Sequence, residues 1–199
     1  MSEQLYLPVS IGEALDKLSI LDIKLDMIKD SRRENVKIEY DLLYIKLENY
    51  IVEFKFLYDE MKKINHEIWL EMDKLRDAQI SDEKYLKVCK KTVIDNDIRF
   101  RIKNKINNLA KSNIKEQKGY LVTKFYLTII NDDIKLHEFC INYFSLRYDE
   151  IYVSSNLENE IKIKFNYDPT IKFVNNNEYN NIYINQSDNI NNINLNNSI

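Results

Sequence analysis

Three groups of side chains recur at helical spacing and together have the chemistry of an anion site. The groups lie in residues 13–24, 65–76 and 96–103, and steps of three or four residues place the members of each group on one face of a helix. Arginine forks suit bidentate binding of phosphate or carboxylate, and an indole ring stacks on flat ligand rings. If the three faces converge, the anion cleft consists of Lys17, Lys24, Trp69, Arg76, Arg99 and Lys103.

The same residues also allow a structural interpretation. Each group mixes charge signs, as with Asp73 and Arg76, so salt bridges and amide hydrogen bonds between helices would brace the domain. We expect this bracing as their first role, with one network joining Arg76, Asp73, Asn96 and Arg99. The anion cleft is the alternative.

Other reactive residues form weaker patterns. Asp132 and Asp133 precede a helical segment, where carboxylates commonly cap a helix. His137 and Cys140 have the spacing of a metal pair, but a zinc site needs three or four ligands. No Ser or Cys has a recognisable base nearby. We therefore expect no metal, no cofactor and no catalytic residue, with Asp133 as the one weak catalytic candidate.

Composition limits the classes of partner. The 199 residues carry a net charge of -3 with a pI near 5.6, whereas nucleic acid and anionic membranes attract basic surfaces. The N-terminal residues lack the pattern of a signal peptide, which predicts a soluble cytoplasmic protein with its two cysteines reduced. Frequent Asn, Ile, Lys and Tyr indicate an AT-rich genome, such as that of a giant virus, in which case the location is the host cytoplasm.

Residues 1–118 have the pattern of a helical domain. Ser10 and Glu13 form a capping box before a first helix, and Ser31 and Glu34 form another before a second. The second helix spans 32–78 with a heptad seam and is either continuous or broken at 49–58, where aromatic and β-branched residues gather. A third helix follows Ser81 and ends near residue 112. The predicted core of this antiparallel unit includes Leu18, Leu25, Leu43, Leu47, Met61 and Ile64.

The pattern changes at Gly119. Residues 119–175 alternate between apolar strands and helical segments in the order β-α-β-α-β, which predicts parallel strands with crossover helices. Residues 176–199 are rich in Asn and are interpreted as a low-complexity tail. The predicted fold class is α+β: an antiparallel helical bundle or coiled-coil hairpin, followed by a small truncated Rossmann-like βαβαβ unit.

Two resemblances accompany these patterns. The first rests on spaced motifs of residues 6–120, which are Pro8-Val9-Ser10, Gly12-Glu13, Asp16-Lys17, Ile20-Leu21, Ile23-Lys24, Asn65, Ile68-Trp69, Asp73, Arg76, Asn96-Asp97, Arg99, Lys103 and Ile106-Asn107. Their order resembles a small all-helical family, mainly bacterial, that has no assigned function and is found near glycosyltransferases. The resemblance implies a link to glycan synthesis and no particular activity.

The second resemblance concerns residues 119–175. The segments 148–153 and 168–173 resemble the second and third strands in the first Rossmann half of heptosyltransferase-like glycosyltransferases. Asp133 matches the acid that resembles a catalytic base in that family, but Ile130 and Asp132 stand where the two glycines of its Gly-x-Gly turn would be. The resemblance therefore implies a partial domain.

These observations lead to three functional hypotheses. The first is a non-catalytic or degenerate module that binds a protein partner, a second copy, or an anionic ligand such as a sugar nucleotide through its helices. The second is a glycosyltransferase-like enzyme with Asp133 as base. The third is a coiled-coil scaffold.

Overall fold

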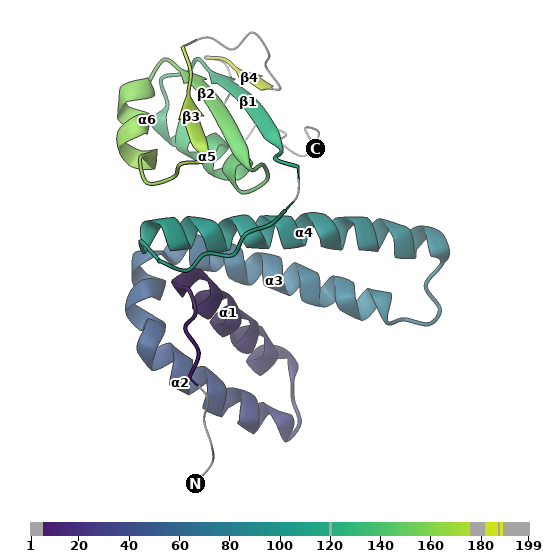
Figure 1. Ribbon diagram of the computed structural model, residues 1–199. Helices are drawn as coiled ribbons and strands as arrows, with labels where there is room; N and C mark the ends of the chain where they lie inside the picture. Colours follow the sequence, from purple (N-terminus) through teal and green to yellow (C-terminus); the bar gives the residue numbers. More distant parts are fainter. Residues whose placement is uncertain (1–5, 120, 176–181, 187, 189–199) are drawn as a thin grey trace. The chain divides into compact units, whose positions relative to one another are not determined.

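The computed structural model describes residues 6–119, 121–175, 182–186 and 188. The chain divides into two compact units, residues 1–117 and 118–199. The first unit is helical and the second contains a parallel sheet, as Figure 1 shows. The predicted fold class is confirmed.

The helical unit contains α1 (Ile11–Met27), α2 (Arg32–Glu53), α3 (Lys55–Leu75) and α4 (Asp82–Leu109). At the start of α1, Ser10 Oγ accepts a hydrogen bond from the Glu13 amide at 3.1 Å, as the capping box predicts. The second predicted box is wrong, because Ser31 is in the helical region and makes no side-chain cap. The α1 helix packs against all three other helices, and α3 runs along α4 (Figure 1).

The long helix predicted for residues 32–78 bends at Phe54. No Pro or Gly occurs there, and the backbone hydrogen bonds continue through the bend, from the Phe54 amide to Tyr50 and from the Tyr58 amide to Phe54, both at 2.9 Å. Phe54 itself is buried and has φ -108° and ψ 31°. The continuous helix is therefore wrong and the alternative with a break is correct. Because of the bend, α1 contacts both α2 and α3.

The predicted core of this unit is confirmed in part. Leu18, Leu47 and Met61 are buried. Leu25, Leu43 and Ile64 are half-buried.

The second unit contains β1 (Lys124–Ile129), α5 (Ile134–Ser145), β2 (Glu150–Ser155), α6 (Glu158–Phe165), β3 (Ile171–Phe173) and β4 (Ile182–Ile184). The strand order is β3-β2-β1-β4 and every pair is parallel. Phe125 pairs with Ile151 in register, and Ile151 with Ile171. The buried faces of the strands and of α5 and α6 form one apolar core.

The fourth strand was not predicted. It lies in the Asn-rich segment 176–199, where the pattern indicated only a tail, and Leu127 of β1 pairs with Ile182. The rest of that segment lies outside the described residues, apart from residues 185, 186 and 188. The three predicted strands and both crossover helices are confirmed.

Candidate functional site

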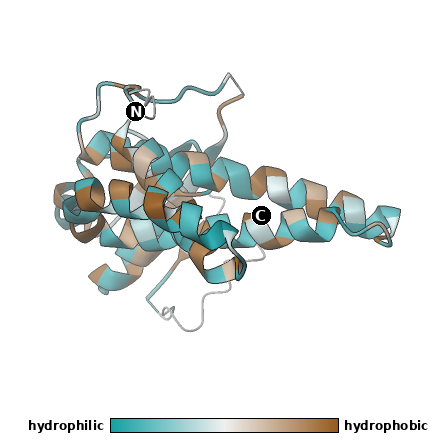
Figure 2. Cartoon of the chain, turned by 90° about the horizontal axis from the view of Figure 1, so that it is seen from below, coloured by the Kyte–Doolittle hydropathy of each residue, from teal (hydrophilic) through white to brown (hydrophobic). Residues whose placement is uncertain are grey.

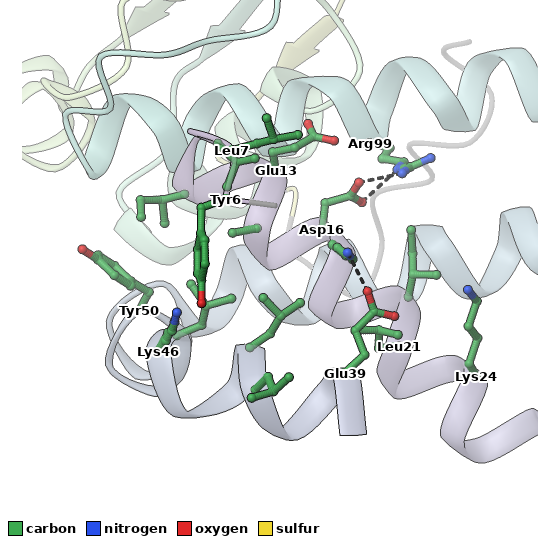
Figure 3. Close-up of a pocket in the computed structure, with 18 residues that line it drawn as sticks. Tyr6, Leu7, Glu13, Asp16, Leu21, Lys24, Glu39, Lys46, Tyr50 and Arg99 are labelled. Carbon is green, nitrogen blue, oxygen red and sulfur yellow. Dashed lines mark hydrogen bonds and ion pairs between the residues drawn. The ribbon is translucent and has the colours of Figure 1, made fainter. Parts of the chain in front are cut away.

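A cleft of about 980 Å³ lies between residues 6–9, α1 and α2 (Figure 3). Its wall is mostly apolar and consists of Leu7, Val9, Ile11, Ala14, Ile20, Leu21, Leu42, Leu43 and Leu47. Tyr6 and Tyr50 add aromatic rings, and the Lys17–Glu39 ion pair, 2.6 Å long, joins α1 to α2. Such a mixture of apolar wall and polar rim is typical of a binding groove.

The cleft is open because α2 buries little of its apolar surface. Leu47 is the one buried residue among the 22 of α2, whose inner side chains Leu43 and Tyr50 are half-buried. By contrast, α1 presents buried residues to α2, α3 and α4. The apolar seam of α2 is therefore part core and part accessible wall.

One edge of the cleft is a buried polar network around Asp16. Arg99 donates to both Asp16 oxygens, at 2.8 Å from Nε and 2.6 Å from Nη2. Asn65 Nδ2 donates to Asp16 Oδ1 and to Ser19 Oγ, both at 2.8 Å. The bond to Asp16 raises the pKa of Arg99. The network locks α1, α3 and α4 together, and the charge of Arg99 is neutralised by Asp16.

A second brace joins the start of α1 to α4. Lys103 Nζ lies 3.0 Å from Glu13 and 2.5 Å from Glu116. Burial lowers the pKa of Lys103, but the hydrogen bonds that Lys103 donates to Glu116 and Glu13 outweigh that effect and the pKa is raised. Gly12 permits the close approach, because a Cβ there would lie 2.4 Å from the Lys103 carbonyl oxygen. The Gly12 amide donates to Asn107 Oδ1 at 2.7 Å.

A third brace joins α3 to α4 through Glu71, Lys91 and Asp95. Lys91 Nζ lies 2.5 Å from Glu71 and 2.6 Å from Asp95, between α3 and α4. Both carboxylates are buried, and burial raises the pKa of Asp95. The Lys91 ammonium group therefore lies between two buried carboxylates and partly offsets their charge.

A smaller pocket of about 230 Å³ lies beside Trp69. Arg76, Arg99 and Ile20 also line it, and Arg76 is bound to Asp73 on its own helix at 3.3 Å. Arg99 and Ile20 line both the pocket and the larger cleft. The three predicted faces thus meet around Arg99, but their residues do not share one site. Lys17 and Lys24 line the larger cleft, Trp69 and Arg76 line the smaller pocket, and Lys103 lines neither.

The ion pairs decide what the six predicted anion-binding residues can do. Lys17, Arg76, Arg99 and Lys103 each bind a carboxylate, whereas Trp69 carries no charge. Lys24 lines the cleft and takes part in none of the ion pairs found among the described residues. The bracing interpretation thus accounts for most of these residues.

The predicted network of Arg76, Asp73, Asn96 and Arg99 is wrong in its partners. Asn96 donates to the Thr92 carbonyl within α4 at 2.9 Å, and Arg99 binds Asp16 on α1. Sequence reasoning also missed Tyr6, Lys46 and the accessible side of Leu43 in the cleft. For Leu43 the heptad spacing was the available signal, but it is the same for a packed seam and an open groove.

In the second unit Asp133 caps α5. Its Oδ1 accepts from the Lys135 amide at 2.9 Å, and its carboxylate is exposed. Asp132 accepts from Asn156 at 3.1 Å. Two carboxylates thus lie at the start of the helix, where a Rossmann fold would bind a phosphate, and they disfavour an anion there.

The carboxyl ends of β1 and β4 are joined by a buried amide. Asn131 Nδ2 donates to the Asn185 carbonyl at 2.9 Å and to the Asp188 carbonyl at 3.1 Å. In open parallel sheets, ligands bind at this edge where the strand order reverses. Here the Asn131 side chain connects the ends of β1 and β4 at that edge.

His137 and Cys140 belong to the core of the second unit. Both are buried, and His137 Nε2 lies 2.8 Å from the Asn131 carbonyl while Nδ1 lies 3.0 Å from Ser155 Oγ. A carbonyl only accepts, so Nε2 carries the proton and Nδ1 accepts from Ser155. Burial lowers the pKa of His137 and raises that of Cys140 to about 12. Among the described residues no group of three or more His, Cys, Asp or Glu is placed to hold a metal ion.

Comparison with known proteins adds no relative: no family model matches, and the searches of curated proteins and of solved structures are also without a match. Within the part of the chain that the structure describes, no helix has the length and apolar character to cross a membrane. Figure 2 shows hydrophilic and hydrophobic residues alternating along the helices.

Proposed function

We propose that this chain is a non-catalytic binding module whose helical domain holds an apolar segment of a protein partner. The observation that carries the proposal is the cleft of about 980 Å³ with its apolar wall. Leu7 and Leu42 in that wall are 68% and 55% exposed. Burying such surface against a partner is favourable at about 25 cal/mol per Å².

The rim of the cleft indicates the character of the segment. Lys24 and Lys46 line the rim, and neither takes part in the ion pairs described for this chain. Carboxylates on the partner segment would complement them, while its apolar side chains meet Leu7, Leu42 and Leu43. A small anion alone is a poorer fit, because Lys17 and Arg99 already bind carboxylates.

The proposal extends to the pathway and the compartment in which the module acts. The resemblance of residues 6–120 to a family found near glycosyltransferases supports a partner in glycan synthesis. The two free thiols, Cys89 and Cys140, support a reducing compartment such as the cytoplasm.

Selection from a library of random peptides tests the cleft directly. Peptides that bind the wild-type chain should be apolar with acidic residues. The substitutions Leu7→Glu and Lys24→Glu should each lower the affinity for these peptides about tenfold or more. Val93→Glu is the matched control, because Val93 is 64% exposed on α4 and lies outside the cleft. Peptides that bind the cleft variants as well as the wild type would refute the proposal.

A separate assay tests the alternative that the chain is a glycosyltransferase-like enzyme. The chain is incubated with a panel of nucleotide sugars, and nucleotide release is followed, with Asp133→Asn as control. We expect no release above background, because Asp133 caps α5 and its turn lacks the glycines that would admit a substrate. Turnover that disappears in Asp133→Asn would establish the enzyme instead.

A further inference from the structure

The outer face of α2 carries a second heptad stripe, distinct from the seam that packs on α1. Ile38, Leu42, Ile45, Asn49 and Val52 follow one another at alternating steps of four and three, the spacing of d and a positions in a coiled coil. The four apolar members are between 55% and 78% exposed, and Asn49 is exposed as well. Leu42 alone also lines the cleft. This outer stripe is an unpartnered helix face.

The polar member of the outer stripe falls at an a position. A single Asn at such a position fixes register and pairing in coiled coils at a cost in stability. Asn49 stands between Ile45 and Val52, where a fully apolar residue would pack better. A face that merely tolerated exposed apolar residues would have no use for this regular arrangement.

The flanks of the outer stripe decide what can occupy it. The e and g positions within α2 are Glu34, Glu39, Asp41, Lys46, Glu48 and Glu53. Glu39 is paired with Lys17 and Asp41 with Lys37. The other flanking acids, Glu34, Glu48 and Glu53, take part in none of the ion pairs among the described residues, so both flanks are acidic.

A second copy of the chain is a poor occupant for this face. In a parallel pair, Glu48 would face Glu53 of the second copy and Glu34 would face Glu39, while only Asp41 and Lys46 would attract. In an antiparallel pair centred on the stripe, Glu48 would face Glu48, and Asn49 would face Ile45. Like charges across e and g positions disfavour pairing, and a buried amide opposite an apolar residue loses its hydrogen bonds.

We propose that the outer stripe docks an amphipathic helix of another protein, with apolar a and d positions and Lys or Arg on both flanks. The stripe spans residues 38–52, which is about 21 Å of helix. Two heptads bury less surface than the roughly 1,200–2,000 Å² of a stable interface, so the complex is a transient one. The outer stripe shares Leu42 with the cleft, and Glu39 and Lys46 on its flank also line the cleft. The inference does not depend on the function proposed for the cleft, because Ile38, Ile45, Asn49 and Val52 lie outside it.

Two designed helical peptides test the proposal. They share three heptads of Ile and Leu with one Asn, and they differ in carrying Lys or Glu at every e and g position. Fluorescence anisotropy with the wild-type chain should show binding of the basic peptide, weakened by salt, and at least about tenfold weaker binding of the acidic one. Equal binding of both peptides, or of neither, would overturn the proposal.

Variants of the outer stripe separate apolar docking from simple charge attraction. Ile45→Glu adds an acid and would strengthen a purely electrostatic complex. We expect it instead to lower the affinity for the basic peptide about tenfold or more. The double change Glu48→Lys with Glu53→Lys should reverse the preference toward the acidic peptide. Val93→Glu is the control and should bind as the wild type does. Tighter binding by Ile45→Glu would show charge attraction alone, against the proposal.

Self-association is measured on the same samples by sedimentation velocity. The proposal predicts a monomer at the concentrations of the binding assay. A dimer that Ile45→Glu dissociates would make a second copy the occupant and would overturn the proposal. Circular dichroism of Ile45→Glu should match the wild type, because this side chain is 72% exposed.

Discussion

The helices α1 and α2 are neighbours with opposite surroundings. Seven of the 17 residues of α1 are buried, and Asp16 and Ser19 are among them. Only Leu47 of the 22 residues of α2 is buried. The comparison teaches that α1 holds the helical unit together, whereas α2 attaches by one face and leaves the others accessible.

The difference extends to charge. Around α1, the buried ionic groups Asp16 and Lys103 are matched by partners, in the Asp16–Arg99 pair and the Lys103–Glu13 pair. On α2, Lys46 and Glu48 take part in none of the ion pairs among the described residues. A helix with matched charges braces a fold, and a helix with unmatched charges and exposed apolar residues is suited to partners.

The largest loss of stability is expected when Asp16, the buried acid of α1, loses its partner Arg99. Arg99→Met leaves Asp16, which is 2% exposed, without its cation, and this should cost about 3–5 kcal/mol of unfolding free energy. Urea unfolding followed by Trp69, the single Trp of the chain, reports on the helical unit.

Arg76→Met is the control for that change, because the Arg76–Asp73 pair is exposed. Its loss should cost at most about 1 kcal/mol. Equal costs for the two variants would mean that the Asp16 network does not stabilise the fold more than a surface ion pair.

The two faces of α2 can be compared in one helix. Leu47→Ala should cost about 2–5 kcal/mol because Leu47 packs in the core. Ile45→Ala on the outer stripe should change stability by no more than about 0.5 kcal/mol. The same urea experiment measures both, and a large loss in Ile45→Ala would show that the outer face is already covered.

A smaller effect is expected at the point where α1 meets α4. In Gly12→Ala the new Cβ would lie 2.4 Å from the Lys103 carbonyl oxygen, so the helices must separate and stability should fall by about 1–3 kcal/mol. This is the net loss, which already includes the gain of about 1 kcal/mol that Ala brings to a helix. Gly119→Ala is the control, because nothing lies within 4 Å of a Cβ there. A Gly12→Ala variant as stable as the wild type would contradict the close approach of α1 to α4 at Gly12.

The smallest expected effect is a dependence of the second unit's unfolding free energy on pH. Burial lowers the pKa of His137, so below the ordinary pKa of about 6.5 the unfolded chain binds a proton before the folded one does. The stability that this neutral imidazole contributes is present above that pH and is lost as pH falls through the folded pKa. Urea unfolding followed by NMR signals of the β1 and β2 amides should show the slope, and His137→Gln should reduce it. The same slope in both proteins would assign it to other groups.

Much of the fold could be predicted because its elements have regular signals. Apolar periodicity and the caps at Ser10 and Ser81 located α1 and α4, and β-branched runs located three strands. The bend at Phe54 could only be an alternative, since a heptad seam looks the same in straight and bent helices. The strand β4 has three residues in an Asn-rich segment, and its pairing with β1 is a tertiary effect.

The site could be predicted less well than the fold. Periodicity placed Arg99 correctly on a face that meets the other helices, but it could not identify Asp16 as the partner 83 positions away. It also gave no sign that Gly12 allows a close helix contact. Partner choice among many charged residues depends on the rotation of each helix, which spacing alone leaves undetermined.

The most direct test of the central claim is a titration of methyl-labelled protein, observed by NMR, with a peptide selected for binding and then with nucleotide sugars. The account predicts that the peptide shifts the methyl signals of Leu7 and Leu43 in the cleft, and that the nucleotide sugars shift none. Shifts confined to Leu127 and Leu136, near the carboxyl end of β1 and the start of α5, on addition of a nucleotide sugar would contradict it. That result would place the function in the second unit.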